Sequence, residues 1–366
     1  MADGEGGGAV RFGIIRCAAI ACTFFRAIKL APNATLVAIA SRSLSKAEAF
    51  KSSNGVEDSV TLYGDYESLL NDLSVDAVYI PLPTSFHVKW AVAAVEKKKH
   101  VLLEKPTAMN VAELDVIIQA CEVNGVQFMD GTMWIHHRRT DKMKEFISDP
   151  SLFGELKTVH SNFTYPPDSN FLANNIRLNP NLDGLGALGD IGWYCIRSIL
   201  WATDYKLPNS VVANRNPTFT DAGVLLSCGA SLIWNNGLIA TFHCSMQAQS
   251  SMDLCVIGTR GIIHVNDFVT PFDETVASFN VCSNSRFTEP IIGWQRPLPR
   301  EEVVQMEIPQ EARMVVEFSK LVAGVRDEHR SPEMKWVAIT RKTQLVVDAV
   351  LASIENEFKS VDVHQG

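Results

Sequence analysis

The N-terminal third of the chain alternates between short apolar runs and amphipathic helical segments. Apolar runs occupy residues 11–15, 35–40, 75–80, 101–103 and 126–129, and helical patterns lie between them. Such alternation predicts a doubly wound parallel sheet, because each parallel strand pair needs a crossover connection that is usually a helix. A chain of 366 residues, 46% of them hydrophobic, also has enough material for a second domain.

The pattern changes after Met133. From Leu156 onward, short runs alternate apolar and polar residues, which is typical of antiparallel strands with one buried face. Helical patterns return at 311–324 and 337–357. We therefore predict an α/β protein with an α+β second part, divided into a flexible N-terminus (1–9), a dinucleotide-binding Rossmann domain (10–133) and a substrate-binding domain with a C-terminal helix (134–366).

Residues 11–21 lie where a doubly wound fold binds the pyrophosphate of a dinucleotide. Glycines usually occupy three marker positions of this strand–turn–helix segment, but here the positions hold Arg16, Ala18 and Ala21. Arg16 is the largest departure. A left-handed backbone there costs about 1–2 kcal/mol for a residue other than glycine, and the guanidinium can either bind a phosphate or fill its space. The cofactor contacts predicted in this segment are Arg16, Cys17, Ala18 and Ile20.

Two other segments follow predicted strands, at the edge where an open parallel sheet binds ligands. One begins at Pro81 and the other is Glu104-Lys105-Pro106. A lysine at this edge can act as an acid, an electrostatic stabiliser or an imine-forming nucleophile; the alternative is a solvated lysine before a turn. The cofactor contacts predicted from these segments are Pro81, Leu82, Thr84, His87, Glu104 and Lys105.

Ser41 and Arg42 follow the second predicted strand, about 20 residues beyond the fingerprint. An acidic residue at this place would bind the ribose hydroxyl of NAD, whereas a serine and an arginine suit a 2′-phosphate. The sequence therefore favours NADP over NAD.

Asp190 and Tyr194 lie four residues apart at the predicted start of a helix, so they share one helical face. A carboxylate and a phenol in this arrangement can position and protonate a carbonyl oxygen. The alternative is an aspartate that complements the helix dipole, beside a core tyrosine. The run 136–139, His-His-Arg-Arg, has no matching Cys/His cluster, so we predict solvated or interface residues there and no metal site.

The amino-acid composition limits the classes of partner that we expect the protein to bind. The formal net charge is −8 and no long lysine- or arginine-rich run occurs, which argues against nucleic acid. No apolar run reaches the length of a membrane span, and the eight cysteines include no Cys-x-x-Cys pair. We expect reduced thiols in a cytoplasmic protein that binds no membrane.

Several segments together resemble the Gfo/Idh/MocA oxidoreductases. The similarity is strongest with plant cytosolic members and with the dimeric dihydrodiol and D-xylose dehydrogenases. It covers about residues 10–360. The segments that carry it are Pro83-Thr-Ser-Phe-His87, Lys99-His-Val-Leu-Leu-Glu-Lys-Pro106, Gly131-Thr-Met-Trp134, Gly186-Ala-Leu-Gly-Asp-Ile-Gly-Trp-Tyr194 and Arg341-Lys-Thr-Gln-Leu-Val-Val-Asp-Ala349.

The resemblance implies an open-faced antiparallel sheet used for oligomerisation, here a homodimer. It implies hydride transfer between NAD(P) and a sugar, polyol, diol or related carbonyl. Lys105 matches the family's active-site lysine, and Asp190 and Tyr194 match the other half of the site; the lysine's charge would lower the pKa of the phenol. Arg16 and Lys98 stand where the family usually has glycine.

Three functions are consistent with this pattern. The first is an NADP-dependent dehydrogenase or reductase, in which Lys105 and Tyr194 handle the proton and Asp190 orients. The second is a non-redox isomerase, lyase or cyclase that uses the same three residues, and the third is a non-catalytic family member. We expect a small-molecule substrate, whose identity the sequence does not give. The predicted substrate contacts are Trp134, Tyr165 and Trp193.

Overall fold

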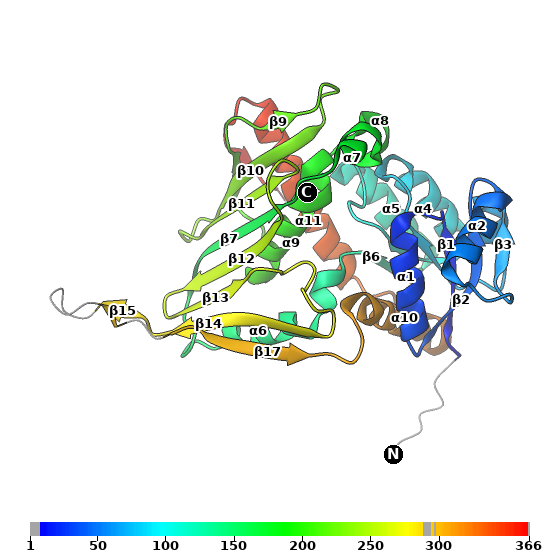
Figure 1. Cartoon of the computed structure of the whole chain (residues 1–366), viewed down its shortest axis with the longest axis horizontal. Helices are drawn as coiled ribbons and strands as arrows, with labels where there is room; N and C mark the ends of the chain where they lie inside the picture. Colours follow the sequence, from blue (N-terminus) through cyan, green and yellow to red (C-terminus); the bar gives the residue numbers. More distant parts are fainter. Residues whose placement is uncertain (1–7, 288–293, 296–297, 365–366) are drawn as a thin grey trace, which may run out of the picture. The chain divides into compact units, whose positions relative to one another are not determined.

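A computed structural model describes residues 8–287, 294–295 and 298–364, which form two compact units (Figure 1). The first unit contains residues 1–133 and 308–341, and the second contains residues 134–307 and 342–366. The predicted division at residue 133 into two consecutive domains does not include the return of residues 308–341 to the first unit. The return brings α10 (Gln310–Glu328) against α1 (Ala19–Leu30), where the Asn33 amide donates to Val316 O at 3.0 Å.

The first unit contains a six-stranded parallel sheet of order β3-β2-β1-β4-β5-β6, which confirms the predicted doubly wound architecture. Its strands are β1 (Val10–Ile15), β2 (Ala34–Ala40), β3 (Thr61–Tyr63), β4 (Ala77–Ile80), β5 (His100–Leu103) and β6 (Phe128–Asp130). Its helices are α1, α2 (Leu44–Asn54), α3 (Tyr66–Leu70), η1 (Thr84–Phe86), α4 (His87–Glu96), α5 (Val111–Asn124) and α10, and α11 (Lys335–Glu355) begins in this unit.

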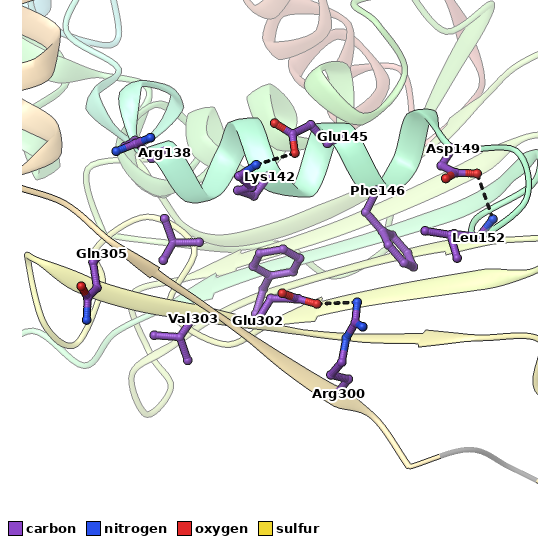
Figure 2. Close-up of a pocket in the computed structure, with 12 residues that line it drawn as sticks. Arg138, Lys142, Glu145, Phe146, Asp149, Leu152, Arg300, Glu302, Val303 and Gln305 are labelled. Carbon is purple, nitrogen blue, oxygen red and sulfur yellow. Dashed lines mark hydrogen bonds and ion pairs between the residues drawn. The ribbon is translucent and has the colours of Figure 1, made fainter.

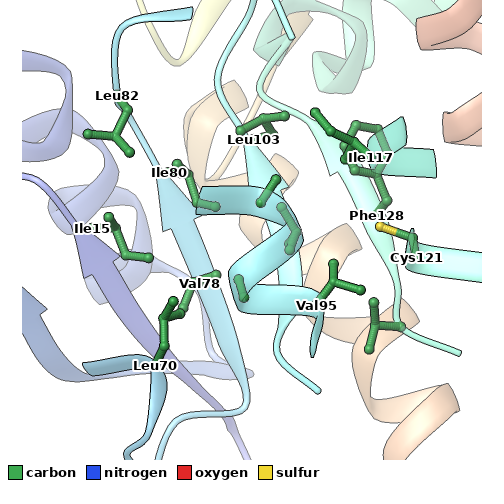
Figure 3. Packing of buried hydrophobic residues seen from close by; sticks show 14 of the residues in the cluster. Ile15, Leu70, Val78, Ile80, Leu82, Val95, Leu103, Ile117, Cys121 and Phe128 are labelled. Atoms are coloured by element: carbon green, nitrogen blue, oxygen red, sulfur yellow. The ribbon is translucent and has the colours of Figure 1, made fainter. Parts of the chain in front are cut away.

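Alternate residues of the parallel strands pack on opposite faces of the sheet. On one face, Val78 and Ile80 join α4 and α5 in a buried apolar cluster (Figure 3). On the other face, Phe12 packs edge-on against Phe24 of α1, and Tyr79 stacks on the same ring at 3.7 Å between centroids. Burial on both faces explains why these strands read as continuous apolar runs.

The second unit is built on a ten-stranded mixed sheet of order β17-β14-β13-β12-β7-β11-β10-β8-β18, with β9 beside β10. All its pairings are antiparallel except that of β7 with β11, as expected for a mostly antiparallel sheet. The strands are β7 (Leu156–Thr164), β8 (Ser210–Ala213), β9 (Thr218–Phe219), β10 (Leu225–Ile233), β11 (Ile239–Ser245), β12 (Ser251–Gly258), β13 (Gly261–Val265), β14 (Val276–Ser283), β17 (Arg300–Gln305) and β18 (Val361–Asp362), with β15 (Arg286–Phe287) and β16 (Trp294–Gln295) as a separate pair.

One face of this sheet is covered and the other is open. Helix α9 (Trp193–Ala202) packs against β7 and β11, and α6 (Arg138–Ser148) lies beside β14 and β17 (Figure 1). On the opposite face the side chains of His160, His243 and His264 are exposed. The remaining helical turns of the second unit are η2 (Met133–His136), α7 (Ser169–Asn174), η3 (Ile176–Leu178), α8 (Pro180–Asp183) and η4 (Leu188–Gly192).

Two residues of the run 136–139, His137 and Arg139, are buried, whereas we expected solvated or interface residues there. Arg139 is 1% exposed and its guanidinium forms an ion pair of 2.5 Å with Asp267. His137 is also buried, and its Nδ1 accepts from Arg139 N at 2.9 Å, which caps α6. Buried charges require such partners, and a partner 128 residues away is not readable from a charged tetrapeptide.

His100 should make the protein labile to acid. Burial lowers the pKa of its imidazole from 6.5 to about 4, and its Nδ1 accepts from Gln127 N at 2.8 Å. A histidine with a lowered folded pKa takes up its proton more readily when unfolded. Its contribution, about 3 kcal/mol, is therefore complete above pH 6.5 and is lost as the pH falls toward 4.

Denaturant titrations between pH 7 and pH 4 should show a shallower loss of stability for His100→Asn, which keeps an acceptor. The control is His160→Asn on the open sheet face, which should retain the wild-type slope. Equal slopes for wild type and His100→Asn would contradict the assignment.

Candidate active site

Arg16 directly follows β1, at the point where the strand order of the first sheet reverses between β1 and β4. Its φ of 90° lies in the left-handed region, a conformation that is costly for a residue other than glycine. Its amide donates to the oxygen of Ala40, the last residue of β2, at 2.9 Å, and its guanidinium Nη1 donates to Pro81 O after β4 at 3.3 Å. The crevice between β1 and β4 is the place where open sheets of this order bind dinucleotides.

Helix α1 begins directly after this turn, with Ala18 at its N-cap. No side chain caps α1 and its first turn contains no acidic residue. The free N–H groups and dipole of a helix N-terminus favour an anion, and the cation of Arg16 adds to this field. The turn therefore fits a phosphate ligand electrostatically, despite its missing glycines.

The end of β2 contributes Ser41 and Arg42. Arg42 is exposed, whereas Ser41 is 4% exposed and its amide donates to Tyr63 O at 3.1 Å. Burial raises the pKa of the Tyr66 phenol, and the positive charges of Arg16 and Arg42 oppose this rise. Both arginines therefore act electrostatically on one phenol at the carboxyl edge of the sheet.

Lys105 lies in the loop after β5, beside a cis peptide bond to Pro106. The preceding Glu104 holds this loop, because its carboxylate accepts from the Tyr79 hydroxyl and from Lys105 N. Gly131 leaves room for that carboxylate, since a Cβ there would lie 3.0 Å from Glu104 Oε1. Glu104 thus positions the lysine through the main chain.

His87 links the loops after β4 and β5. The side chain is 1% exposed, and its two ring nitrogens lie 2.9 Å from Leu82 O and 3.1 Å from Thr107 O. Main-chain oxygens therefore face both nitrogens, so His87 braces the segment that carries Lys105. Its contact with the cofactor stays a prediction.

The other expected cofactor residues lie at the same edge of the first unit. Burial raises the pKa of the Cys17 thiol to about 11, which makes it a poor nucleophile. Ile20 is 42% exposed on the first turn of α1, while Leu82 and Thr84 are buried. Direct contacts of these residues with a cofactor also stay predictions.

In the second unit, Asp190 lies in η4, a π-helical turn, and not in the regular helix start expected from sequence. Its Oδ1 lies 2.7 Å from Arg177 Nε and its Oδ2 accepts from the Tyr165 hydroxyl at 3.0 Å. Burial and the charge of Asp190 raise the pKa of Tyr165, and Asp190 also raises the pKa of Arg177. π-Helical turns of this kind are frequent at functional sites.

Tyr194 is the second residue of α9 and lies beside the ring of Phe163. Phe163 lies 6.0 Å from the Tyr194 ring and 6.4 Å from the Tyr165 ring, and Phe171 meets Tyr165 edge-on at 5.9 Å. The rings of Tyr165 and Tyr194 thus belong to one aromatic cluster within this unit. Such surroundings suit a ring-shaped substrate with few charges.

Trp134 and Trp193, the other expected substrate contacts, are both buried. Trp134 is 1% exposed and packs edge-on against Trp201 and Phe268. Trp193 is fully buried, with the Arg197 guanidinium 5.4 Å from its ring centroid. The structure places both in packed surroundings, and their contact with substrate stays a prediction.

A separate groove of about 610 Å³ lies between α6 and the strands β14 and β17 (Figure 2). Phe146 and Phe279 supply apolar surface to it. Its charged side chains are largely paired with one another, as in Lys142–Glu145 at 2.7 Å and Arg300–Glu302 at 2.5 Å. None of the predicted site residues lines this groove.

Comparison with known proteins identifies the family. The D-xylose 1-dehydrogenase (NADP(+)) 2 of Haloferax volcanii is 33% identical over 256 residues, which are 70% of this chain and 75% of that protein. The profile "Oxidoreductase family, NAD-binding Rossmann fold" matches residues 10–132, and the "GFO/IDH/MocA C-terminal domain" matches residues 140–264. The chain belongs to the GFO/IDH/MocA oxidoreductases. It is an NAD(P)-dependent oxidoreductase of this family.

Other known oxidoreductases resemble the chain over most of its length. The trans-1,2-dihydrobenzene-1,2-diol dehydrogenase of Danio rerio is 28% identical over 70% of this chain and 74% of its own. KijD10, a 3-ketoreductase from Actinomadura kijaniata, was crystallised in an open conformation with TDP-benzene and NADP. It superposes with a TM-score of 0.74 at 25% identity, covering 94% of this chain and 97% of that one. These relatives act on sugars and diols. A plant branch stays a prediction.

Proposed function

We propose that the protein is an NADP-dependent dehydrogenase or reductase that transfers a hydride between the cofactor and a sugar, polyol, diol or related carbonyl. The observation that carries this proposal is the lysine at the carboxyl end of β5, held by Glu104 and His87 at the dinucleotide-binding edge of the first sheet. A solvated lysine before a turn would not require a loop that is held by contacts with Tyr79 and His87.

The side chains of the first unit fit a dinucleotide. The α1 N-terminus and Arg16 would hold the pyrophosphate, and Ser41 and Arg42 the 2′-phosphate. Bound nicotinamide supplies the hydride or accepts it. The chain supplies the proton chemistry: the ammonium of Lys105 stabilises charge on the reacting oxygen, and the Tyr194 phenol donates or accepts the proton.

The preference for NADP rests on charge. No acidic side chain stands at the end of β2 to receive a ribose hydroxyl, and Arg42 is exposed there. NADP-linked relatives support the preference: one carries NADP(+) in its name and another was crystallised with NADP. Two phosphate groups near Arg16 and Arg42 would offset the mutual repulsion of these cations.

We propose in addition a homodimer that forms through the open face of the ten-stranded sheet. The exposed residues of that face include Ile239 and Val276, both more than 40% exposed, among polar neighbours. Light scattering tests the dimer.

In the part of the chain that the structure describes, no helix is long and apolar enough to cross a membrane. Location in the cytoplasm stays a prediction.

Arg16→Gly should separate stability from cofactor binding. Glycine removes the left-handed strain and should raise the free energy of unfolding by about 1 kcal/mol, whereas loss of the guanidinium should weaken NADPH binding about tenfold. Calorimetry measures the affinity and denaturant titration measures the stability.

Lys98→Gly is the matched control, because Lys98 also has a positive φ, of 59°, at a site without a predicted phosphate. This variant should gain stability and keep the wild-type affinity for NADPH. Tighter NADPH binding by Arg16→Gly would show instead that Arg16 fills the phosphate space.

The proposed activity is tested by following NADPH absorbance with a panel of sugars, diols and ketones. Turnover that requires added cofactor is the expected result. Turnover by cofactor-free protein, abolished in Tyr194→Phe, would favour an isomerase, lyase or cyclase instead.

A further inference from the structure

Both oxygens of the Asp190 carboxylate are already engaged within the second unit. Oδ1 lies 2.7 Å from Arg177 Nε, and Oδ2 accepts from the Tyr165 hydroxyl at 3.0 Å. The Asp190 side chain is only 10% exposed, so water contributes little to its solvation. A buried carboxylate with a cationic donor on one oxygen is stabilised in its charged form, which makes it a poor proton acceptor and a good fixed anion.

Arg177 is held in place by its own segment. It lies in η3, where its amide donates to Asn175 Oδ1 at 3.0 Å. The flanking turns are capped in the same way, by Asp168 before α7 and by Asn179 before α8. Side-chain caps at three successive turns fix the backbone that carries the arginine, so the guanidinium reaches Asp190 from a defined position.

We propose that Arg177 is a positioning residue of the candidate active site. It fixes Asp190 as a carboxylate, which in turn holds the Tyr165 phenol beside the aromatic side chains around Tyr194. Asp190 then organises the site and leaves proton transfer to Tyr194. This inference rests on the proposed function, because it assigns a role in that reaction.

A second role for Arg177, direct capture of an anionic substrate group, is disfavoured by the local charge. Asp190 forms an ion pair with the guanidinium, and Asp183 also lies close enough for its charge to raise the pKa of Arg177. Two carboxylates against one guanidinium leave a net negative charge. The arrangement therefore fits a neutral hydroxylated substrate better than a carboxylate or phosphate.

The test compares Arg177→Met, Arg177→Lys, Asp190→Asn and the double variant Arg177→Met/Asp190→Asn. Arg177→Met should lower kcat about 100-fold, with KM and the NADPH Kd within threefold of wild type. Arg177→Lys should recover part of the loss. The double variant should be no slower than Asp190→Asn, because the arginine acts through the carboxylate. The acid limb of the pH–rate profile should move to higher pH in Arg177→Met, since the carboxylate loses its cation.

Lys157→Met is the matched control. It removes an ion pair with Glu155 from the same unit, at 2.9 Å and 48% side-chain exposure, and should leave kcat and the pH profile unchanged. A merely structural role for Arg177 predicts lower thermal stability with kcat and pH profile unchanged, and that result overturns the inference. Additive losses in the double variant also overturn it. Absence of NADPH-dependent turnover in wild type would overturn the proposed function itself.

Discussion

Lys105→Ala should lower kcat by about 1,000-fold while the Kd for NADPH changes less than threefold. The ammonium acts on charge that develops at the reacting oxygen, an effect that does not contribute to ground-state binding of the cofactor. Tyr194→Phe removes the phenolic hydroxyl and keeps the ring, and it should lower kcat by about 100-fold or more. Single-turnover measurements with NADPH give the chemical step free of product release.

Two variants serve as controls for this result: one removes another lysine of the first unit, and the other replaces Lys105 by a second cationic residue. Lys97→Ala removes an exposed lysine of the first unit and should leave kcat unchanged. Lys105→Arg keeps the positive charge that acts on the reacting oxygen, so it should recover part of the lost activity. If Lys105→Ala retains wild-type kcat, the lysine is an ordinary loop residue and the assigned mechanism fails.

Arg42→Ala should convert the preference for NADPH into near equality with NADH. A hydrogen-bonded ion pair with a phosphate contributes about 1.5–3 kcal/mol, which corresponds to a loss of about 10- to 150-fold in NADPH affinity. The Kd for NADH should change less than twofold, because NADH lacks the 2′-phosphate. Arg42→Asp should go further and favour NADH, since a carboxylate can accept the ribose hydroxyl.

Lys46→Ala serves as the control for this pair, because it removes an exposed cation from α2 without touching the end of β2. It should alter neither affinity. Equal losses of NADPH and NADH affinity in Arg42→Ala would place the arginine at the pyrophosphate or adenine and not at the 2′-phosphate.

Local sequence signals predicted the first unit well. Helix α5 (Val111–Asn124) is bounded by such signals, because Asn110 Oδ1 accepts from Glu113 N at 2.9 Å and Gly125 ends the helix in the left-handed region with φ 65°. The marker position of Arg16 raised the question of a left-handed backbone, and the observed φ of 90° answers it. Both features depend on residues within one turn, which the sequence displays directly.

Features that depend on distant partners were missed. Strand β3 spans only Thr61–Tyr63 and forms by pairing with β2, so its own sequence carries little signal. Arg177 resembled an ordinary loop arginine, and only the fold brings it to Asp190. The buried pair of Arg139 and Asp267 is the same case. Charged residues acquire such roles through tertiary contacts that no local period encodes.

A calorimetric titration of the wild-type protein with NADPH most directly tests the central claim, which is that the protein binds and uses NADPH. The account predicts saturable binding with a Kd of about 100 µM or below, and weaker binding of NADH. No detectable heat at about 1 mM NADPH would contradict it, and would leave Lys105, Asp190 and Tyr194 to a reaction that needs no hydride.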